Sequence, residues 1–419
     1  MNIGIVTTWF ERGASYVSRQ YVKSLKKDHE IFIYVRGGES RAYGNREWDD
    51  GESVTWGRDI SELGFQWIDL IDFERWLKNC QIEVVLFNEQ AWWPPILLCN
   101  ELGIKTAAYI DYYTEETIPF FGVYDLLLCN TKRHYSAFEW HPQCFYLPWG
   151  TEISLFKPET YQAVERGVIT FFHSCGMNPR RKGTDLLLKA YAKVGDRSRL
   201  VIHSQVKLAS FFPELRGIIE KLKATGRLIC YEQTVTAPGL YHLGDVYVYP
   251  SRLDGIGLTI AEALACGLPV ITGDAAPMNE FIHEQTGALA KIARWYARQD
   301  GYYWPQCNVD IDSLGSCMNS YLISTDELSD RKKSARAYAE KHLNWETNSN
   351  ELPDIFSQLR KPPSTETSDL VERIKEYEQR RASLKGKLYL TAPSVARVLL
   401  KARGLTRTIR RTALAEARS

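Results

Sequence analysis

This sequence of 419 residues lacks clear signals for a metal centre, a disulfide framework, a membrane span or nucleic-acid binding. Its formal net charge is +1, so the chain as a whole has no electrostatic attraction for a polyanion. The nine cysteines include no CxxC pair and the eight histidines have no zinc-type spacing, so we expect reduced thiols in a cytoplasmic protein. No run of about 18 apolar residues occurs, so no membrane-spanning helix is expected. The N-terminus lacks the pattern of a secretory signal peptide.

The composition is that of a soluble globular protein, with 44% hydrophobic and 25% charged residues. A chain of this length is too long for one typical core, so two domains are expected. Short apolar segments alternate with helix-like segments in two successive runs, which predicts parallel βαβ units and an α/β fold. The expected strands are 2–10, 30–38, 83–88, 105–111 and 124–131, then 167–175, 198–205, 226–232, 244–251 and 268–274.

The predicted organisation has four parts. A connector at 143–158, with Pro and Gly, separates the two runs of strands. The parts are a first domain at 1–150, a second at 151–345, a helix at 346–360 returning to the first domain, and a linker and basic tail at 361–419. From Ala382 onward the tail has nine lysines and arginines against one acid, Glu416. It is either an accessory or disordered appendage, or an electrostatic membrane contact over 382–419.

The segment "SRLDGIGLTIAEALACGLPVI" (251–271) places two carboxylates, Asp254 and Glu262, around a glycine-rich turn and a helix start. The turn follows a strand end, where ligands bind in parallel sheets. Its glycines allow a close backbone approach, and the unpaired first amides of a helix suit a phosphate. These backbone positions are Gly255, Ile256, Gly257 and Leu258, and the helix is expected to run from about Leu258 to Cys266 and to end at Gly267. The alternative is a solvated Asp and a helix Glu stabilised by the dipole.

A second loop in the same domain carries three adjacent cations, Arg180, Arg181 and Lys182, after the strand at 167–175. Arg offers bidentate contacts and Lys a point charge, which suits a diphosphate. The alternative is a solvated basic loop. Two such loops at strand ends of one domain favour a sugar nucleotide, with acids for its hydroxyls and cations for its diphosphate.

These residues resemble the retaining GT-B glycosyltransferases of family 4, the glycosyl transferases group 1. The resemblance is carried by "YPSRLDGIGLTIAEALACGLPVITGD" and "GMNPRRKGTDLLLKAY", and more weakly by "MNIGIVTTWF" and "PWGTEISLFKP", over roughly residues 1–360. It implies two Rossmann-like α/β/α domains facing a central cleft, here with a basic helical C-terminal tail. The implied reaction moves a sugar from a UDP- or GDP-sugar to a hydroxyl group with retention, without a metal or a further cofactor.

The resemblance also implies roles for individual residues. Glu262 would hold the donor ribose, and Asp254 would face the hydroxyls of the donor sugar. Arg181 and Lys182, with Arg180 as the alternative, would hold the diphosphate, and Arg181, Lys182 and Asp254 would carry the catalysis. Gly13 would permit a close approach of the first domain to the donor phosphate or to the acceptor. The chain departs from the family with Asp for Glu at 254, Met177 in place of an Arg, Ile110 in place of a His, and one glycine in the first loop.

The acceptor is expected on the first domain. "FNEQAWWPP" (87–95) follows a strand end, and the candidates are Asn88, Glu89, Trp92 and Asp111. Trp rings stack on sugars, but Trp92 is equally compatible with a place in the core. The acceptor would be a saccharide, a lipid-linked sugar or a protein, as in bacterial surface polysaccharide or glycoconjugate synthesis. A lipid-linked acceptor would place the protein at the inner face of the membrane.

Three other features have ordinary structural interpretations. His173 and His203 follow strand residues and are expected to be packed side chains. The D-x-D at 310–312 resembles a metal motif, but an Asp before a helix is more simply a cap. "GIGLTI" lacks the third glycine of a dinucleotide fingerprint, which argues against a dehydrogenase. Two alternatives to a transferase stay open: a nucleotide-binding or interaction protein with little turnover, and a sugar-nucleotide epimerase.

Overall fold

The computed structural model describes residues 1–159, 167–323, 327–361 and 368–398. Two compact units are distinguished by their internal contacts. The first comprises residues 1–110, 117–128 and the described residues from 352 onward, and the second comprises 111–116 and 129–351. This division assigns 129–150 to the second unit, whereas the predicted boundary lies at 150. Among the described residues, no helix combines the length and the apolar character needed to cross a bilayer.

A seven-stranded sheet forms the core of the first unit. Its strand order is β3-β2-β1-β4-β5-β6-β7, and the pairs from β3 to β6 are parallel. The strands are β1 (Asn2–Thr7), β2 (Glu30–Val35), β3 (Val54–Trp56), β4 (Val84–Asn88), β5 (Lys105–Tyr109), β6 (Leu126–Cys129) and β7 (Cys144–Tyr146). The helices that accompany them are α1 (Gly13–Leu25), α2 (Leu70–Asn79), α3 (Pro94–Glu101), η1 (Ile118–Val123) and α4 (Lys132–Phe138).

A six-stranded parallel sheet forms the core of the second unit, in the order β10-β9-β8-β11-β12-β13. This is the 3-2-1-4-5-6 order of doubly wound folds, whose ligands bind where the order reverses, here between β8 and β11. The strands are β8 (Ile169–Gly176), β9 (Ser198–Ser204), β10 (Leu228–Glu232), β11 (Val246–Tyr249), β12 (Val270–Gly273) and β13 (Gly287–Ala290). An antiparallel ribbon, β14 (Ile292–Tyr296) and β15 (Gln306–Val309), follows.

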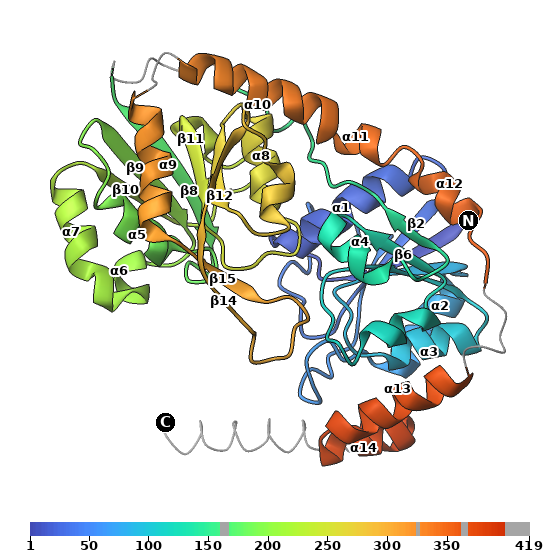
Figure 1. Cartoon of the computed structure of the whole chain (residues 1–419). Coiled ribbons are helices and arrows are strands. Elements are labelled where there is room, and N and C mark those ends of the chain that lie inside the picture. Colours follow the sequence, from blue (N-terminus) through green and yellow to red (C-terminus); the bar gives the residue numbers. More distant parts are fainter. Residues whose placement is uncertain (160–166, 324–326, 362–367, 399–419) are drawn as a thin grey trace. The chain divides into compact units, whose positions relative to one another are not determined.

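Helices cover both faces of this second sheet, and α5 packs against α9 while α8 packs against α10 (Figure 1). Because both faces are buried, the strands are almost continuously apolar. The helices are α5 (Thr184–Tyr191), α6 (Leu208–Phe211), α7 (Arg216–Ala224), α8 (Leu258–Ala265), α9 (Ile311–Ile323), α10 (Leu328–His342) and α11 (Trp345–Asn348), with short 3-10 turns η2 (Pro213–Leu215), η3 (Tyr241–Leu243) and η4 (Met278–Phe281).

Three C-terminal helices, α12 (Leu352–Ser357), α13 (Ser368–Arg381) and α14 (Leu384–Thr391), belong to the first unit. The Glu378 carboxylate on α13 accepts the backbone N–H of Trp93 at 3.1 Å. The Tyr389 hydroxyl on α14 accepts the N–H of Leu70 at 2.8 Å. Residues 368–398 are therefore packed structure, which excludes the disordered alternative for that part of the tail. Residues 399–419 of the predicted tail and 362–367 of the predicted linker lie outside the described residues.

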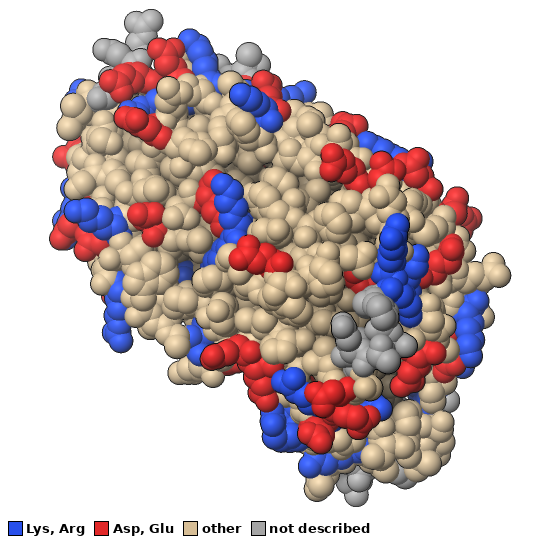
Figure 2. Space-filling model, turned by 45° about the vertical axis from the view of Figure 1, so that its right-hand side comes forward, with Lys and Arg blue, Asp and Glu red and all other residues tan. Residues whose placement is uncertain are grey.

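On the face shown in Figure 2, acidic and basic side chains are interspersed around a broad uncharged area. This distribution agrees with the net charge of +1.

Candidate functional site

The first predicted loop joins β11 to α8 in the second unit. Gly257 precedes the helix with φ of 90°, and α8 runs from Leu258 to Ala265, close to the predicted helix. Gly267, with φ of 77°, follows the end of α8 as predicted. Positive φ strains residues with a side chain, so both turns require glycine. Within the described part of the chain, the N–H groups of Ile256, Gly257 and Leu258 have no hydrogen-bond partner, and they are available to a ligand.

The second predicted loop joins β8 to α5 and lies directly against the first. Gly183 has φ of 72°, and a Cβ atom there would come within 1.9 Å of the carbonyl oxygen of Pro250. Only glycine permits this approach. The backbone N–H of Arg252 also donates to the carbonyl of Arg181 at 2.8 Å. The structure therefore brings together the two loops that the sequence had suggested separately.

An ion pair joins the two loops. The Lys182 ammonium donates to Asp254 Oδ2 at 2.5 Å, and the side chains are only 15% and 12% exposed. The Tyr249 hydroxyl donates to the same oxygen and accepts from Lys182. The N–H of Gly255 donates to Asp254 Oδ1 at 3.0 Å. A carboxylate has about four acceptor positions, so these three bonds leave Asp254 Oδ1 able to accept a ligand hydroxyl.

Burial and charge set the protonation states of this cluster. Burial alone would raise the pKa of Asp254, but the charges of Lys182 and Arg181 hold that pKa well below its ordinary value. Burial, together with the charge of Arg181, lowers the pKa of Lys182 to about 8 against the opposing effect of Asp254. Burial also raises the pKa of Tyr249 well above its ordinary value. At neutral pH the site therefore holds a carboxylate, an ammonium group and a neutral phenol.

The two neighbouring arginines differ in position. Arg181 Nη1 lies 3.9 Å from Asp254 Oδ1 and donates to the carbonyl of Leu253 at 3.4 Å. Arg180 is half exposed and donates to Glu214 at 2.7 Å. The geometry thus groups Arg181 with Lys182 and Asp254, and it separates Arg180 from them.

Glu262 lies one turn into α8 and is partly buried. The Tyr241 hydroxyl donates to Glu262 Oε2 at 2.5 Å. Burial raises the pKa of Glu262, while the hydrogen bond from Tyr241 and the charge of Lys182 act to lower it. One oxygen of Glu262 is therefore oriented by Tyr241 and the other can accept a hydroxyl.

The acceptor candidates do not form one group. Asn88 ends β4 and is buried, and its amide donates to the carbonyl of Ala14 at 2.8 Å and to Ser18 Oγ at 2.6 Å. Glu89 follows with φ of 52°, a backbone conformation uncommon for a residue with a side chain. Asp111 belongs by its contacts to the second unit. Gly13 begins α1 in the first unit.

Glu89 belongs to a cluster of four charged side chains, here called the charged quartet: Arg12, Arg36, Glu39 and Glu89. Arg12 lies 3.3 Å from Glu89 and 3.9 Å from Glu39. Arg36 is buried, donates through Nη1 to the carbonyl of Asn88 at 2.7 Å, and has its Nε 3.3 Å from Glu39. Among the described residues, Arg36 Nη2 and Asn88 Oδ1 lack hydrogen-bond partners. Buried polar atoms without partners are rare, so this edge of the first sheet retains unused hydrogen-bonding capacity.

Trp92 is a core residue, which corrects its assignment as a sugar-stacking side chain. It is 2% exposed, and its ring stacks on that of Trp67 at 4.6 Å between centroids. Trp93 is equally buried and packs edge-on against Phe121. Neither ring has a face open to a ligand.

His173, His203 and Asp310 have structural roles in the fold, as predicted. His173 is buried between the carbonyl of Val248 at 2.7 Å and the hydroxyl of Thr184 at 2.8 Å. His203 contacts the hydroxyl of Ser174 and the carbonyl of Gln233. Asp310 accepts the N–H of Ser313 at 2.8 Å and caps α9. Among the described residues, no group of three His, Cys, Asp or Glu side chains is placed to hold a metal.

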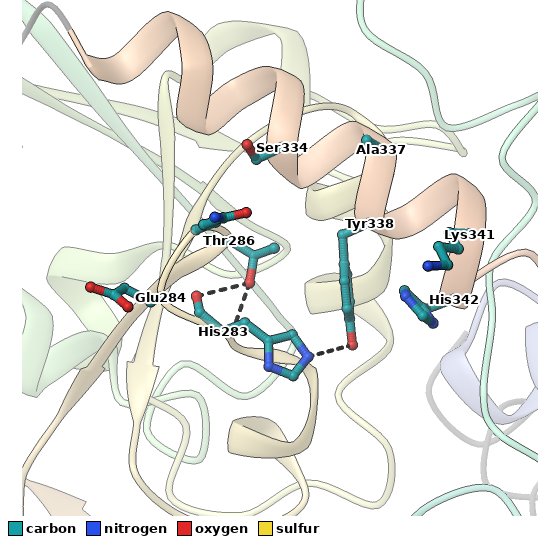
Figure 3. Close-up of a pocket in the computed structure, with 9 residues that line it drawn as sticks. His283, Glu284, Thr286, Ser334, Ala337, Tyr338, Lys341 and His342 are labelled. Carbon is teal, nitrogen blue, oxygen red and sulfur yellow. Dashed lines mark hydrogen bonds between the residues drawn. The ribbon is translucent and has the colours of Figure 1, made fainter.

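A hollow of about 580 Å³ lies on the second unit between the segment 283–286 and α10 (Figure 3). The rings of His283 and Tyr338, which both line it, pack edge-on with their centroids 4.9 Å apart, and His283 Nε2 lies 3.0 Å from the Tyr338 hydroxyl. None of the predicted site residues lines this hollow. It is separate from the Lys182–Asp254 cluster.

Sequence reasoning missed four contributors to the site: Tyr249, Tyr241, Arg133 and His134. Arg133 and His134 contact the backbone of the loop at Asp254 and Gly255. The tyrosines lie in or next to apolar segments and resemble core residues in the sequence. Only Arg133 and His134 could have been suspected from the sequence, because they are adjacent polar residues in the first turn of a helix that follows a buried strand.

The chain is similar in sequence to known glycosyltransferases. Residues 168–297 match the family described as Glycosyl transferases group 1. The GDP-mannose-dependent monoacylated alpha-(1-6)-phosphatidylinositol monomannoside mannosyltransferase of Corynebacterium glutamicum is 25% identical over 244 residues, covering 54% of this chain and 59% of that protein. The lipopolysaccharide core biosynthesis mannosyltransferase LpsB of Rhizobium meliloti is 26% identical over 194 residues, 44% of this chain and 48% of LpsB. The chain spans about half the length of these curated relatives.

Solved structures share the fold at low identity. HepE of Anabaena in complex with UDP has a TM-score of 0.68 at 15% identity, covering 85% of this chain and 100% of that chain. WaaG, a glycosyltransferase involved in lipopolysaccharide biosynthesis, has a TM-score of 0.61 at 14% identity over 85% and 100% of the two chains. These similarities confirm the predicted fold class of two Rossmann-like domains.

Proposed function

We propose that this chain, whose residues 168–297 match the family described as Glycosyl transferases group 1, transfers a sugar from a nucleoside-diphosphate sugar to a hydroxyl acceptor, with retention at the anomeric carbon. The observation that carries the proposal is the Lys182–Asp254 pair beside the open amides of Ile256, Gly257 and Leu258. A cation and oriented N–H groups can bind a diphosphate, and a neighbouring carboxylate can accept hydrogen bonds from sugar hydroxyls.

The proposed chemistry rests on stabilising the leaving group. Lys182, Arg181 and the amides would bind the diphosphate and stabilise the negative charge that develops on it as the glycosidic bond breaks. Asp254 would orient the donor sugar through its free Oδ1 position. Glu262 would accept the ribose hydroxyls, oriented by Tyr241. The acceptor proton would pass to the departing phosphate, so no protein base is assigned.

The relatives indicate which donors to test first. Both curated relatives are named as mannosyltransferases, one of them dependent on GDP-mannose, and HepE was solved with UDP. GDP-mannose is therefore the leading donor and UDP-glucose the second. Relatives acting on a phosphatidylinositol mannoside or in lipopolysaccharide core synthesis make a glycolipid or saccharide acceptor the leading class.

We assign the acceptor to the charged quartet of Arg12, Arg36, Glu39 and Glu89. Two guanidinium groups and two carboxylates sum to no net charge, so the cluster suits hydroxyl groups that donate and accept better than an isolated phosphate. The side chains of Arg12, Glu39 and Glu89 are 41%, 19% and 20% exposed, so these three can meet a ligand, while the buried Arg36 holds the carbonyl of Asn88 beneath them. The earlier candidate Asp111 is left as a secondary assignment.

The described tail supports a membrane contact. Its exposed apolar side chains are Leu384, Leu388, Val395 and Val398. Lys385 and Lys387 lie beside them on α14, and the sequence beyond 398 is basic. Apolar anchors flanked by cations match the surface of an anionic bilayer. Sedimentation with vesicles containing phosphatidylglycerol tests this: Leu384→Glu should reduce binding, and equal binding by wild type and variant would contradict it.

The transfer reaction is tested directly by nucleotide release from a panel of donors, including GDP-mannose and UDP-glucose, with and without glycolipid acceptors. The wild type should release one nucleotide in preference to the others, and Lys182→Met should abolish release. Lys189→Met is the matched control because Lys189 is exposed on α5, the helix that follows the loop of Lys182. Full activity of Lys182→Met, or no release from any donor, would refute the proposal and favour a binding protein. A changed sugar nucleotide without release would favour an epimerase.

A further inference from the structure

The first turn of α4 is fixed by side chains on both sides. The Thr131 hydroxyl accepts the N–H of His134 at 3.2 Å. The carboxylate of Glu280 accepts the N–H groups of Lys132 at 2.7 Å and Arg133 at 3.0 Å. These bonds determine where the side chains of Arg133 and His134 begin.

Arg133 and His134 bind two consecutive carbonyl groups of the donor loop. Arg133 Nη2 donates to the carbonyl of Asp254 at 2.5 Å and Nη1 to that of Ala276 at 2.6 Å. His134 Nε2 lies 3.0 Å from the carbonyl oxygen of Gly255. In a trans peptide the N–H points away from the C=O. Holding the carbonyl of Gly255 therefore fixes the direction of the N–H of Ile256, one of the open amides.

The direction of each hydrogen bond between His134, Tyr113 and Trp304 can be assigned. His134 is fully buried, and burial lowers its pKa to about 3, so the ring is neutral. A carbonyl oxygen only accepts, so Nε2 carries the proton and donates to Gly255. Nδ1 must then accept from the Tyr113 hydroxyl at 2.8 Å. That hydroxyl accepts in turn from Trp304 Nε1 at 2.5 Å. A chain of directed hydrogen bonds thus runs from Trp304 through Tyr113 and His134 to the donor loop.

Trp304 lies in the segment 297–305 that joins β14 to β15. This segment is held to residues 111–114: the N–H of Tyr303 donates to the carbonyl of Tyr113 at 2.9 Å, and the Tyr302 hydroxyl donates to that of Asp111 at 3.2 Å. The Arg133 guanidinium lies 5.6 Å from the centre of the Trp304 ring. The ribbon therefore supports both side chains that hold the loop.

We propose that Arg133 and His134 are positioning residues for donor transfer, and that the β14–β15 ribbon holds them in place through Tyr113 and Trp304. The inference rests on the proposed function, because its consequence is the preorganisation of amides that stabilise the leaving diphosphate. Amides aimed in advance at developing charge lower the barrier without reorganising during the reaction. Losing the chain should therefore reduce kcat more than it raises the donor KM.

The test compares Tyr113→Phe with Tyr112→Phe. Both remove one tyrosine hydroxyl from neighbouring positions, but the Tyr112 hydroxyl donates to the carbonyl of Asp300 at 3.0 Å. That bond reaches the same segment 297–305 without belonging to the chain from Trp304 to His134, so Tyr112→Phe controls for a general loosening of the segment. Tyr113→Phe should lower donor kcat/KM roughly tenfold, the worth of one buried hydrogen bond, and Tyr112→Phe should not. Trp304→Phe should act in the same direction. His134→Gln should keep most activity because its amide can still donate to Gly255, whereas His134→Met should not.

Hydrogen exchange provides a readout that needs no turnover. In the purified protein, Tyr113→Phe and His134→Met should accelerate amide exchange in the peptide covering 254–262, and Tyr112→Phe and His134→Gln should leave it unchanged. Equal exchange and equal kcat/KM for Tyr113→Phe and Tyr112→Phe, both folded by circular dichroism, would overturn the inference. If the wild type turns over no donor, the proposed function fails, and the exchange comparison still decides the positioning role.

Discussion

The lowered pKa of Lys182 gives a sharp prediction for the pH dependence of donor turnover. Burial takes this pKa from an ordinary 10.5 to about 8, which corresponds to about 3 kcal/mol against the charged form. The protonated ammonium is the form that binds a diphosphate. The kcat/KM for the donor should therefore fall above pH 8, approaching tenfold for each further unit.

The neighbours of Lys182 do not titrate in this window. Asp254 has its pKa held below its ordinary value by Lys182 and Arg181 despite burial, and burial raises the pKa of Tyr249 well above its own. Lys182→Arg keeps a positive charge at every accessible pH. The variant should lose the fall near pH 8, whatever its activity at neutral pH.

The measurement is a profile of kcat/KM against pH from 6 to 9.5, since kcat/KM reports the free enzyme. Lys189→Arg, on the exposed face of α5, should keep the wild-type profile. Circular dichroism at each pH confirms that the protein is folded. A wild-type profile that is flat through pH 9.5, or a fall near pH 8 that persists in Lys182→Arg, would refute the assignment. The same lowered pKa of Lys182 should raise the free energy of unfolding as pH rises from 8 to 10.5, because in that range the unfolded chain binds more protons than the folded chain.

Three further predictions address stability and the core. Asp254→Asn leaves the ammonium of Lys182 without its charged partner, so it should lower the free energy of unfolding by about 3 kcal/mol, measured with urea, and reduce donor affinity; unchanged stability would contradict the buried pair. Trp92→Ala should cost about 3–5 kcal/mol in urea unfolding while leaving the donor KM unchanged; a large rise in the acceptor KM alone would restore a sugar-stacking role. Burial raises the pKa of Glu378 to about 7, so the folded state binds an extra proton between about pH 4.5 and 7, and stability from this group should fall as pH rises through that range; Glu378→Gln should remove that slope, and an unchanged slope would exclude Glu378 as its source.

The fold followed from the sequence because its signals are local. Short apolar strands and intervening helices repeat along the chain, and both sheets were predicted from that alternation. The donor loop was also readable, because Asp254, Gly257 and Glu262 lie within nine residues of one another. The predicted end of α8 at Gly267 agrees with its left-handed φ of 77°.

The rest of the site could not be read in this way because its contacts join distant parts of the chain. Arg133 lies 121 positions before Asp254, whose carbonyl it binds, and no local pattern links them. Trp92 was ambiguous for a different reason: an aromatic residue before two prolines is equally compatible with a core helix start and an exposed stacking platform. Only its packing against Trp67 decided between them.

The basic tail shows how composition can conceal packing. Its excess of lysine and arginine suggested an appendage, but α14 is held through Tyr389, which packs edge-on against Trp67. A second contact joins Arg397 to the buried Asp69 at 3.4 Å. In this tail a few apolar residues and a few ion-paired residues determine the packing, and the net charge of the segment does not identify them.

Calorimetric titration of the wild type and Glu262→Ala with GDP, UDP and ADP tests the central claim most directly. The account predicts that one nucleotide binds the wild type and that Glu262→Ala loses this binding while remaining folded, because Glu262 accepts the ribose hydroxyls. GDP is the expected ligand. If no nucleotide binds the wild type, or if Glu262→Ala binds equally well, then the loop from 251 to 271 is not a nucleotide-sugar site.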